Sequence, residues 1–224
     1  MSDSRTTILA SIRRSLGVTG QEAIRRAAVE ERLERAPKGV IPARGQIDAA
    51  ARLALFIEKA DYVQSTVQRL ASHADIPDAV ATYLRENNLP AAIRLGEDPR
   101  FAALDWSKTA LDVSRGPSVG DDLAALSHAE AGVAETGTLV VLSGAENPTT
   151  LNFLPDHHLV VVKASDVAGD LESVWPRIRK RYGKGEMPRT VNLITGPSRS
   201  GDIEQTILLG AHGPRSLHIL VVEG

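Results

Sequence analysis

Apolar positions recur along this chain with two different spacings, and segments of the two kinds alternate. Between residues 48 and 70 they recur every three or four positions, as on one face of a helix; they are Leu53, Phe56, Ile57, Ala60, Val63, Val67 and Leu70. Asp48 precedes this stripe and is a good N-cap, so we predict a long helix there. A second helix is predicted to begin at Pro77 and to end at Asn87 and Asn88.

Short runs of apolar and β-branched residues without helical spacing predict strands. They lie at residues 91–95, 109–113, 158–162, 189–194 and 217–222. The last two runs are apolar along most of their length, which is typical of parallel or central strands buried on both faces. Two further short strands are predicted on either side of a turn at residues 135–137. Strands that alternate with helices indicate an α/β sheet.

Two more helices are predicted in the second half of the chain. Residues 121–126 have the pattern of a short helix. Ser165 is expected to cap a longer helix that continues through Val167 to Tyr182. Pro176 falls inside this pattern, so we expect the helix to be kinked or split there.

The first 47 residues differ from the rest. Ile8, Ile12 and Leu16 predict a short amphipathic helix, and the charge-rich residues 21–35 have too little apolar surface to fold alone. Prolines and glycines between residues 37 and 45 mark a linker. We predict that residues 1–47 form an arm and linker, which lies on the main domain or on a partner, and that residues 48–224 form one α/β domain. A partly disordered leader is the alternative for the arm.

Composition excludes several classes of function. The net charge of −2 and the aromatic content of 4% disfavour nucleic-acid binding. The chain has no cysteine, so it forms no disulfide, has no thiol nucleophile and cannot ligate an iron–sulfur cluster through thiolates. No apolar run reaches membrane-spanning length, and the first residues lack the apolar core of a signal peptide. We therefore expect a cytoplasmic protein.

A loop rich in glycine and hydroxyl residues follows the strand at 189–194 and is the first candidate site. Its residues are Gly196, Pro197, Ser198, Arg199, Ser200, Gly201 and Asp202. The glycine spacing is that of a P-loop, but the lysine is missing. An acidic Asp202 where a following helix would begin also weakens a phosphate interpretation. The serines, Arg199 and the loop amides could still hold a small carboxylate. The alternative is a strand-to-helix turn that Ser200 or Asp202 merely caps.

The turn at Glu135, Thr136, Gly137 and Thr138 is the second candidate site. It places a carboxylate and two hydroxyl groups around a glycine between two apolar strands. Such a carboxylate could act as a general base or a nucleophile. An exposed hairpin turn is the alternative.

The histidines give the third candidate. His212 lies next to Gly213 in a tight turn, where it could act as an acid–base or orienting residue. A histidine that only bonds a neighbouring carbonyl is the alternative. His157 and His158 begin a predicted strand, and His158 can point to either face. No HxH or HExxH pattern occurs, so no metal site is predicted.

Four segments, taken in order, resemble the LUD-domain family, and within it the group of lactate utilization C proteins. They are residues 134–139, 154–158, 196–204 and 210–214. Family members usually have Thr-Ala-Asp after the Ser-Arg pair, where this chain has Ser200, Gly201 and Asp202. The resemblance implies a three-layer α/β/α fold with a mostly parallel central sheet, similar to the ribose-phosphate isomerase and CoA-transferase group.

The resemblance also implies a role in bacterial oxidation of L-lactate to pyruvate, alongside partner proteins that carry iron–sulfur clusters. This chain would bind no cofactor itself. The loop around Arg199 and the His212 turn would then hold a small carboxylate such as lactate or pyruvate, or dock the redox partner. The amphipathic arm makes self-association reasonable. Whether the chain is itself an enzyme stays open.

Two alternatives from other classes remain at this point. One is a free-standing enzyme, similar in fold to CoA transferases, that uses Glu135 as a nucleophile on a thioester or sugar phosphate. The other is a ligand-sensing module without catalysis. Under the leading hypothesis, the segments around Glu135, Pro155, Ser198 and His212 converge at one rim of a single open sheet.

Overall fold

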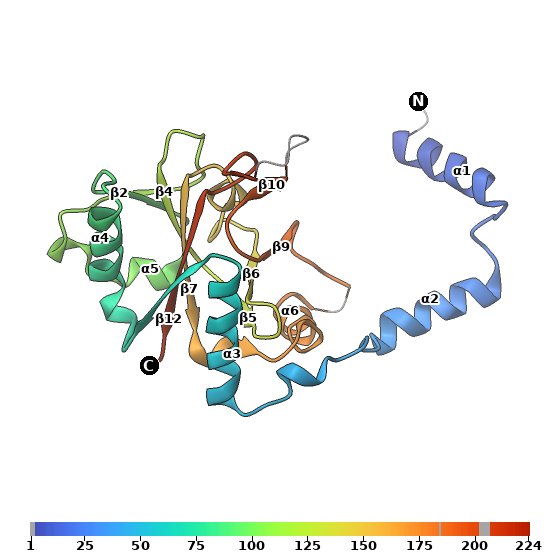
Figure 1. The fold of residues 1–224 in the computed structure, drawn as a ribbon. Helices are drawn as coiled ribbons and strands as arrows, with labels where there is room; N and C mark the ends of the chain where they lie inside the picture. Colours follow the sequence, from blue (N-terminus) through green and yellow to red (C-terminus); the bar gives the residue numbers. More distant parts are fainter. Residues whose placement is uncertain (1–2, 184, 202–206) are drawn as a thin grey trace. The chain divides into compact units, whose positions relative to one another are not determined.

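A six-stranded parallel sheet lies at the centre of the larger of two units in this computed structural model (Figure 1). The structure describes residues 3–183, 185–201 and 207–224. The two units are Met1–Val40 and Ile41–Gly224. The division drawn from the sequence, after residue 47, stays a prediction.

The strands of the central sheet follow the order β1-β12-β7-β4-β2-β3, and every neighbouring pair is parallel. Their bounds are β1 Thr66–Leu70, β2 Ala92–Leu95, β3 Asp112–Arg115, β4 Ala124–His128, β7 His157–Lys163 and β12 Ser216–Val222. β4 and most of β7 and β12 are buried, because parallel strands in the middle of such a sheet are covered on both faces.

Helices cover both faces of this sheet. On one face α4 (Ile76–Glu86) and α5 (Pro99–Ala102) pack over Leu95, Leu126 and other apolar residues of the strands. On the other face α3 (Ala49–Tyr62) packs its Phe56 against the opposite set of strand side chains. The predicted α/β architecture with a mostly parallel central sheet and helices on both sides is confirmed. The likeness to the ribose-phosphate isomerase and CoA-transferase group stays a prediction.

A second, four-stranded sheet adjoins the α3 side in the order β8-β5-β6-β9. Its strands are β5 Ala131–Val133, β6 Thr138–Leu142, β8 Val167–Ala168 and β9 Val191–Ile194. Alternate residues of β6 face opposite ways: Leu139 and Val141 join the α3 core, whereas Val140 packs with Ile178 of α6 (Trp175–Tyr182). β6 therefore links two apolar cores.

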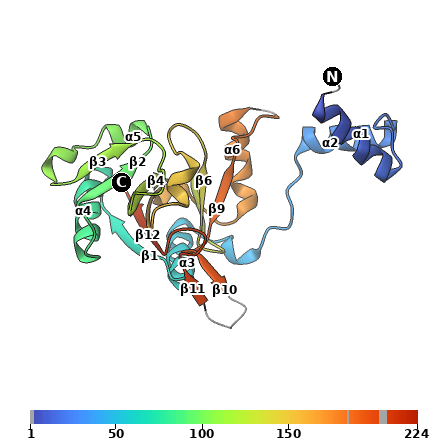
Figure 2. The same ribbon diagram turned by 90° about the horizontal axis from the view of Figure 1, so that it is seen from above.

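The remaining elements are short. A hairpin of β10 (Arg199–Gly201) and β11 (Ile207–Leu209) lies beside the end of α3 (Figure 2). The described residues of the larger unit also form six 3₁₀ turns: η1 Ala43–Gly45, η2 His73–Asp75, η3 Trp106–Lys108, η4 Thr149–Asn152, η5 Ala164–Asp166 and η6 Leu171–Ser173.

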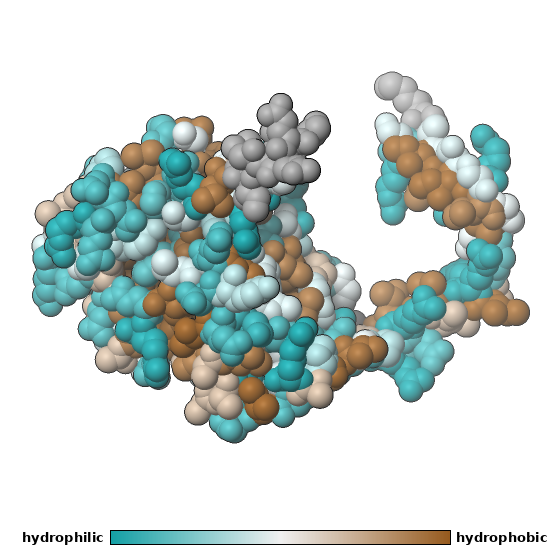
Figure 3. All heavy atoms as spheres, viewed as in Figure 1, coloured by the Kyte–Doolittle hydropathy of each residue, from teal (hydrophilic) through white to brown (hydrophobic). Residues whose placement is uncertain are grey.

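The smaller unit contains the short helix expected in the arm, α1 (Ser4–Leu16), and a second helix, α2 (Ala23–Arg35), in the charge-rich segment. Ile8, Ile12 and Leu16 of α1 are all exposed, and apolar side chains gather along this helix (Figure 3). α1 begins at an Asp3 N-cap and ends at Gly17 in the left-handed conformation.

The prediction of one long helix from residue 48 to residue 70 is wrong for the residues after Tyr62. Asp48 caps α3 as expected by accepting from the amides of Ala50 and Ala51. The helix ends at Tyr62, and Gln64 has a positive φ of 67° that turns the chain. Val67 and Leu70 belong to β1, where pairing with β12 replaces the helical hydrogen bonds.

Two further helix predictions are corrected. Residues 121–126 do not form a helix, because from Ala124 onwards they form β4, which is fully enclosed between β2 and β7. The helix predicted from Ser165 begins only at Trp175; Val167 is in β8, and Pro176 occupies the first turn, where its missing N–H costs no hydrogen bond.

Two segments form strands as predicted, but one pairs in a different sheet and the other begins later in the sequence. The run at 189–194 forms β9, which is not a central or parallel strand. It pairs antiparallel with β6 at the edge of the second sheet. The strand predicted at 109–113 begins only at Asp112.

Candidate functional site

The loop after β9 continues into the β10–β11 hairpin, not into a helix. Arg199 pairs with Leu209 and Gly201 with Ile207 in antiparallel register. A strand-to-helix turn capped by Ser200 is therefore wrong, because Ser200 lies in β10. Asp202 lies outside the described residues.

This loop and the turn at residues 210–214 form one pocket of about 270 Å³, here called the loop pocket. It lies at the amino ends of β7 and β12, whose second residues, His158 and Leu217, are in its wall. Its lining residues are Asn152, Phe153, His158, Leu193, Ile194, Thr195, Gly196, Pro197, Ser198, Arg199, His212, Gly213, Pro214 and Leu217. Six of the residues proposed from the sequence thus line one pocket.

Ser198 joins the two segments of the loop pocket. Its amide donates to the carbonyl of Pro214 over 2.8 Å, and its carbonyl accepts from the amide of Gly210 over 3.0 Å. Its hydroxyl oxygen accepts from the amide of His212 over 3.4 Å. Ser198 therefore has a structural part in shaping the pocket.

Arg199 is held at the rim of the loop pocket. Its Nη2 donates to the carbonyl of Val63 over 3.2 Å, just beyond the end of α3. Because a guanidinium has five N–H donors, this bond leaves others for a ligand. His212 is exposed on the same pocket.

Two buried polar residues, His158 and Asn152, form part of the wall of the loop pocket and can bond a ligand. The Leu142 carbonyl accepts from Asn147 Nδ2, which fixes that amide; the same Nδ2 lies 3.4 Å from Asn152 Oδ1. Ser127 Oγ donates to Asn152 Oδ1 over 3.2 Å, so its oxygen accepts from His158 Nε2 over 2.9 Å. The described part of the chain offers no hydrogen-bond partner to Asn152 Nδ2 or His158 Nδ1.

His158 is neutral at physiological pH. Burial in the centre of the sheet lowers the pKa of its imidazole to about 3, because the charged form is poorly solvated there. With the proton on Nε2, Nδ1 carries a lone pair. The loop pocket thus combines a buried acceptor on His158, a buried donor on Asn152 and the guanidinium of Arg199.

Sequence reasoning missed Asn152 and assigned no role to His158. The sequence signal for His158 was its position at the start of an apolar strand, where a polar side chain is unusual. For Asn152, a polar residue between two apolar ones in Leu151–Phe153 gave no indication of its burial, because that depends on the contact between η4 and β4.

The Glu135 turn connects β5 and β6, as predicted, and packs against the end of α3. The Glu135 side chain is 10% exposed, and its Oε2 lies 4.0 Å from Arg44 Nε. Thr136 and Thr138 share a 2.7 Å hydroxyl bond, and Thr138 bonds the Thr195 hydroxyl over another 2.7 Å. The Glu135 side chain is therefore largely enclosed, unlike that of an exposed hairpin turn, and its role as a nucleophile stays a prediction.

The expected convergence at one rim of a single sheet needs correction. The segments of Ser198 and His212 meet in the loop pocket, and Phe153 brings the neighbourhood of Pro155 to it. Glu135 is not among the lining residues; its turn is linked to the pocket by the bond between Thr138 and Thr195. Moreover, the pocket lies between two sheets, because the loop follows β9 of the second sheet.

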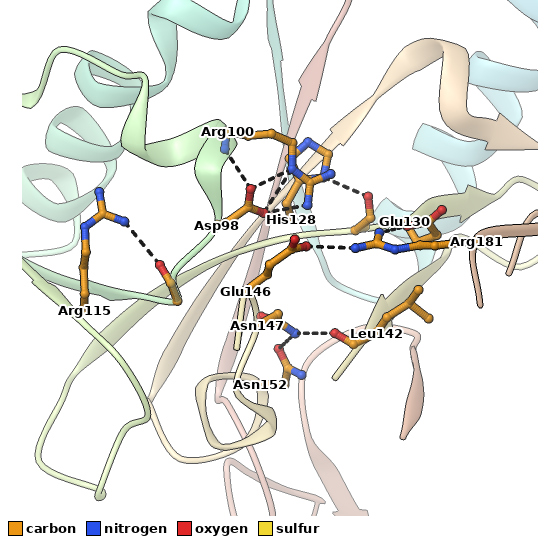
Figure 4. A network of polar contacts seen from close by, with 12 residues as sticks. Asp98, Arg100, Arg115, His128, Glu130, Leu142, Glu146, Asn147, Asn152 and Arg181 are labelled. Atoms are coloured by element: carbon orange, nitrogen blue, oxygen red, sulfur yellow. Dashed lines mark hydrogen bonds and ion pairs between the residues drawn. The ribbon is translucent and has the colours of Figure 1, made fainter. Parts of the chain in front are cut away.

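A second polar group lies at the carboxyl ends of β2 and β4, whereas the loop pocket lies at the amino ends of β7 and β12. Figure 4 shows the side chains of this second group. Asp98, just beyond β2, binds Arg100 through bonds of 2.5 to 3.0 Å. Arg181 of α6 donates to Glu130 over 2.6 Å and to Glu146 over 2.8 Å. Arg100, Arg181 and the two glutamates line a cavity of about 360 Å³ together with His128 at the end of β4; it is here called the network cavity.

Gly96 positions one wall of the network cavity. A Cβ at Gly96 would lie 2.0 Å from the carbonyl oxygen of Glu146, so only glycine allows the 144–147 loop to approach β2. The amide of Glu97 then donates to the carbonyl of Ala145 over 3.1 Å.

Within the described ranges, no cluster of three His, Asp or Glu side chains could hold a metal ion. No helix in those ranges is long and apolar enough to cross a membrane.

The sheet order and the loop pocket define an α/β protein with a ligand-sized pocket between its two sheets. The sequence pattern of the LUD domain matches residues 54–222, so the chain belongs to the LUD domain family. Lactate utilization protein C of Geobacillus thermodenitrificans is 31% identical over 180 residues, which cover 72% of each chain. The uncharacterized protein YkgG of Escherichia coli is 26% identical over 80% of this chain and 82% of its own.

A solved structure shows the same fold. It is a DUF162 family protein from Deinococcus radiodurans, which superposes with a TM-score of 0.56 over 79% of this chain and 99% of its own. At 23% sequence identity this likeness concerns the fold alone.

Proposed function

We propose that this protein takes part in lactate utilization and binds a small 2-hydroxy carboxylate, such as L-lactate, in the loop pocket. Relatives that cover most of the chain are named lactate utilization protein C, which supports the process. The observation that supports this ligand is that one pocket is lined by Arg199 and by two residues with unpartnered buried atoms, the acceptor His158 Nδ1 and the donor Asn152 Nδ2.

The groups of the loop pocket match those of a 2-hydroxy acid. The carboxylate accepts from the guanidinium of Arg199 and from Asn152 Nδ2, since charge-assisted bonds are the strongest polar contacts available. The hydroxyl donates to His158 Nδ1. Pyruvate has no hydroxyl proton to donate, so the same pocket binds L-lactate more tightly than pyruvate.

Oxidation of lactate to pyruvate releases two electrons, and the chain has no cysteine with which to hold an iron–sulfur cluster. We therefore assign electron transfer to iron–sulfur partner proteins. This chain supplies the carboxylate site or the docking surface for such a partner. Its family membership and its lack of thiols support this division of labour.

Substitution Arg199→Gln is expected to raise the dissociation constant for L-lactate about tenfold or more, because a charge-assisted bond is lost. Isothermal titration at pH 7 measures this. Arg189→Gln is the matched control, since Arg189 is also exposed but does not line the loop pocket. Equal affinities for the wild type and Arg199→Gln would remove Arg199 from the site, and no L-lactate binding by the wild type would refute the ligand.

The cellular role has its own test. Deletion of the gene is expected to abolish growth on L-lactate as sole carbon source and to leave growth on pyruvate unchanged. The tagged protein is expected to co-purify with iron–sulfur proteins from lactate-grown cells. Normal growth of the deletion strain on L-lactate would contradict the role in lactate utilization.

A further inference from the structure

The network cavity is separate from the loop pocket and has a different chemical character. It lies where the carboxyl end of β4 meets that of β6, and α/β proteins bind ligands beyond the carboxyl ends of their parallel strands. Its lining residues are Arg100, His128, Glu130, Leu142, Ser143, Gly144, Ala145, Glu146, Asn147, Arg181 and Tyr182. None of them lines the loop pocket.

Two buried acceptors belong to this cavity. His128 is 5% exposed, and its Nδ1 lies 2.9 Å from the carbonyl oxygen of Ala129, which can only accept; Nδ1 therefore carries the proton and Nε2 the lone pair. Asn147 is also 5% exposed, and its Nδ2 is turned toward the carbonyl of Leu142, leaving Oδ1 as an acceptor. Neither His128 Nε2 nor Asn147 Oδ1 has a hydrogen-bond partner in the portion of the chain that the structure describes.

His128 stays neutral in this setting. Burial lowers the pKa of its imidazole to about 4, and the nearby guanidinium of Arg100 acts in the same direction. Two buried acceptors with lone pairs call for a ligand that brings hydrogen-bond donors, because an unsatisfied buried acceptor costs free energy.

The charges around the cavity disfavour an anion. The charged lining residues are two carboxylates, Glu130 and Glu146, and two guanidinium groups. Both guanidinium groups are already paired: Arg100 with Asp98, and Arg181 with both glutamates. With His128 neutral, the lining residues offer an anion no unpaired positive charge. Hydroxyl groups suit such paired ions, because each hydroxyl can donate to a carboxylate and accept from a guanidinium.

We propose that the network cavity is a second binding site, for an uncharged polyhydroxy compound of monosaccharide size. Two hydroxyls of the ligand donate to His128 Nε2 and Asn147 Oδ1, and others bond Arg181 and its carboxylate partners. The cavity volume of about 360 Å³ is in the range of small-molecule sites. The ring of Tyr182, which also lines the cavity, offers an apolar surface to the C–H face of such a compound.

The site is tested by NMR with four uncharged probes, D-ribose, D-glucose, myo-inositol and glycerol, and with L-lactate and inorganic phosphate as anions. At least one of the three larger polyols is expected to shift the ¹⁵N resonance of His128 Nε2 upfield, because this nitrogen begins to accept a hydrogen bond. Phosphate and L-lactate leave it unchanged. No shift of His128 with any polyol, or a shift with phosphate alone, overturns the proposal.

Variants provide the second arm. His128→Phe keeps a planar ring but removes the acceptor, and it is expected to weaken polyol binding about tenfold. His128→Gln keeps an acceptor at similar reach and is expected to restore part of the affinity. Circular dichroism verifies the fold of both. Polyol binding by a folded His128→Phe at wild-type affinity counts against the site, as does His128→Gln behaving like His128→Phe.

Failure of this proposal is distinguishable from failure of the proposed function. Arg199→Gln is expected to lose L-lactate binding and to retain the polyol response of His128, because Arg199 lies in the other pocket. Loss of the polyol response in Arg199→Gln would overturn the assignment of the polyol to the network cavity.

Discussion

Acidification from pH 7 to pH 5 is expected to remove about 6 kcal/mol of folding free energy, which is comparable to the whole stability of many domains. Three buried histidines cause this loss. Burial lowers the pKa to about 3 for His158 and to about 4 for His218. Burial, together with Arg100, lowers that of His128 to about 4.

Stability falls with decreasing pH because the unfolded chain binds more protons than the folded chain. In the unfolded chain these imidazoles titrate near 6.5, so at pH 5 the unfolded state binds protons that the folded state excludes. Their contribution is fully present above pH 6.5 and is lost as the pH falls toward the folded-state pKa values. Each histidine accounts for about 2 kcal/mol at pH 5.

Urea unfolding at a series of pH values between 7 and 5 measures this effect. His158→Gln is expected to lower the slope of stability against pH, since one titrating group is removed. His212→Gln is the matched control, because it also replaces a histidine but at an exposed position. A stability that is flat across this range would show that the three histidines are not buried as described.

Gly137→Ala is expected to lower the free energy of unfolding by about 3 kcal/mol or more. Gly137 has a positive φ of 67°, which disfavours any side chain. An added Cβ would also lie 2.4 Å from the amide nitrogen of Ala60 and 2.5 Å from the carbonyl carbon of Lys59. These are backbone atoms of α3, so relief requires the helix to move.

Gly144→Ala is the control for this change. Gly144 lies in the exposed loop after β6, and a Cβ there meets no atom within 4 Å. Its effect is expected to stay within about 0.5 kcal/mol. Denaturant midpoints at constant m-value measure both variants. If Gly137→Ala unfolds at the wild-type midpoint, the turn does not pack against α3 as described.

Gly137 also shows that a motif residue can be required by packing alone. The carboxylate and hydroxyls of the Glu135 turn suggest catalysis, yet its glycine is needed for the turn to pack against α3, with or without a ligand. Gly196 is similar, since it has a φ of 80° and a Cβ there would lie 2.5 Å from the carbonyl oxygen of Val63. Both glycines allow their loops to approach the end of α3.

The sequence by itself determined the elements whose stability is local. The Asp48 cap and the apolar stripe that follows specify α3, and Pro77 and Asn87 mark the ends of α4, because capping and helical spacing act over a few residues. The turn between β5 and β6 followed from the glycine at its centre. The motif loops around Ser198 and His212 were also identified, and they do line one pocket.

Only the tertiary structure decided which secondary structure the short apolar runs form and which residues line the two pockets. Residues 124–128 form a strand because β2 and β7 lie on either side, whereas their spacing alone does not distinguish a strand from a buried helix turn. The run of β9 resembles that of β12, yet it pairs at the edge of a different sheet. Asn152, His158 and His128 line the two pockets because of their burial and their contacts with distant elements, and the spacing of nearby residues encodes neither their burial nor these contacts.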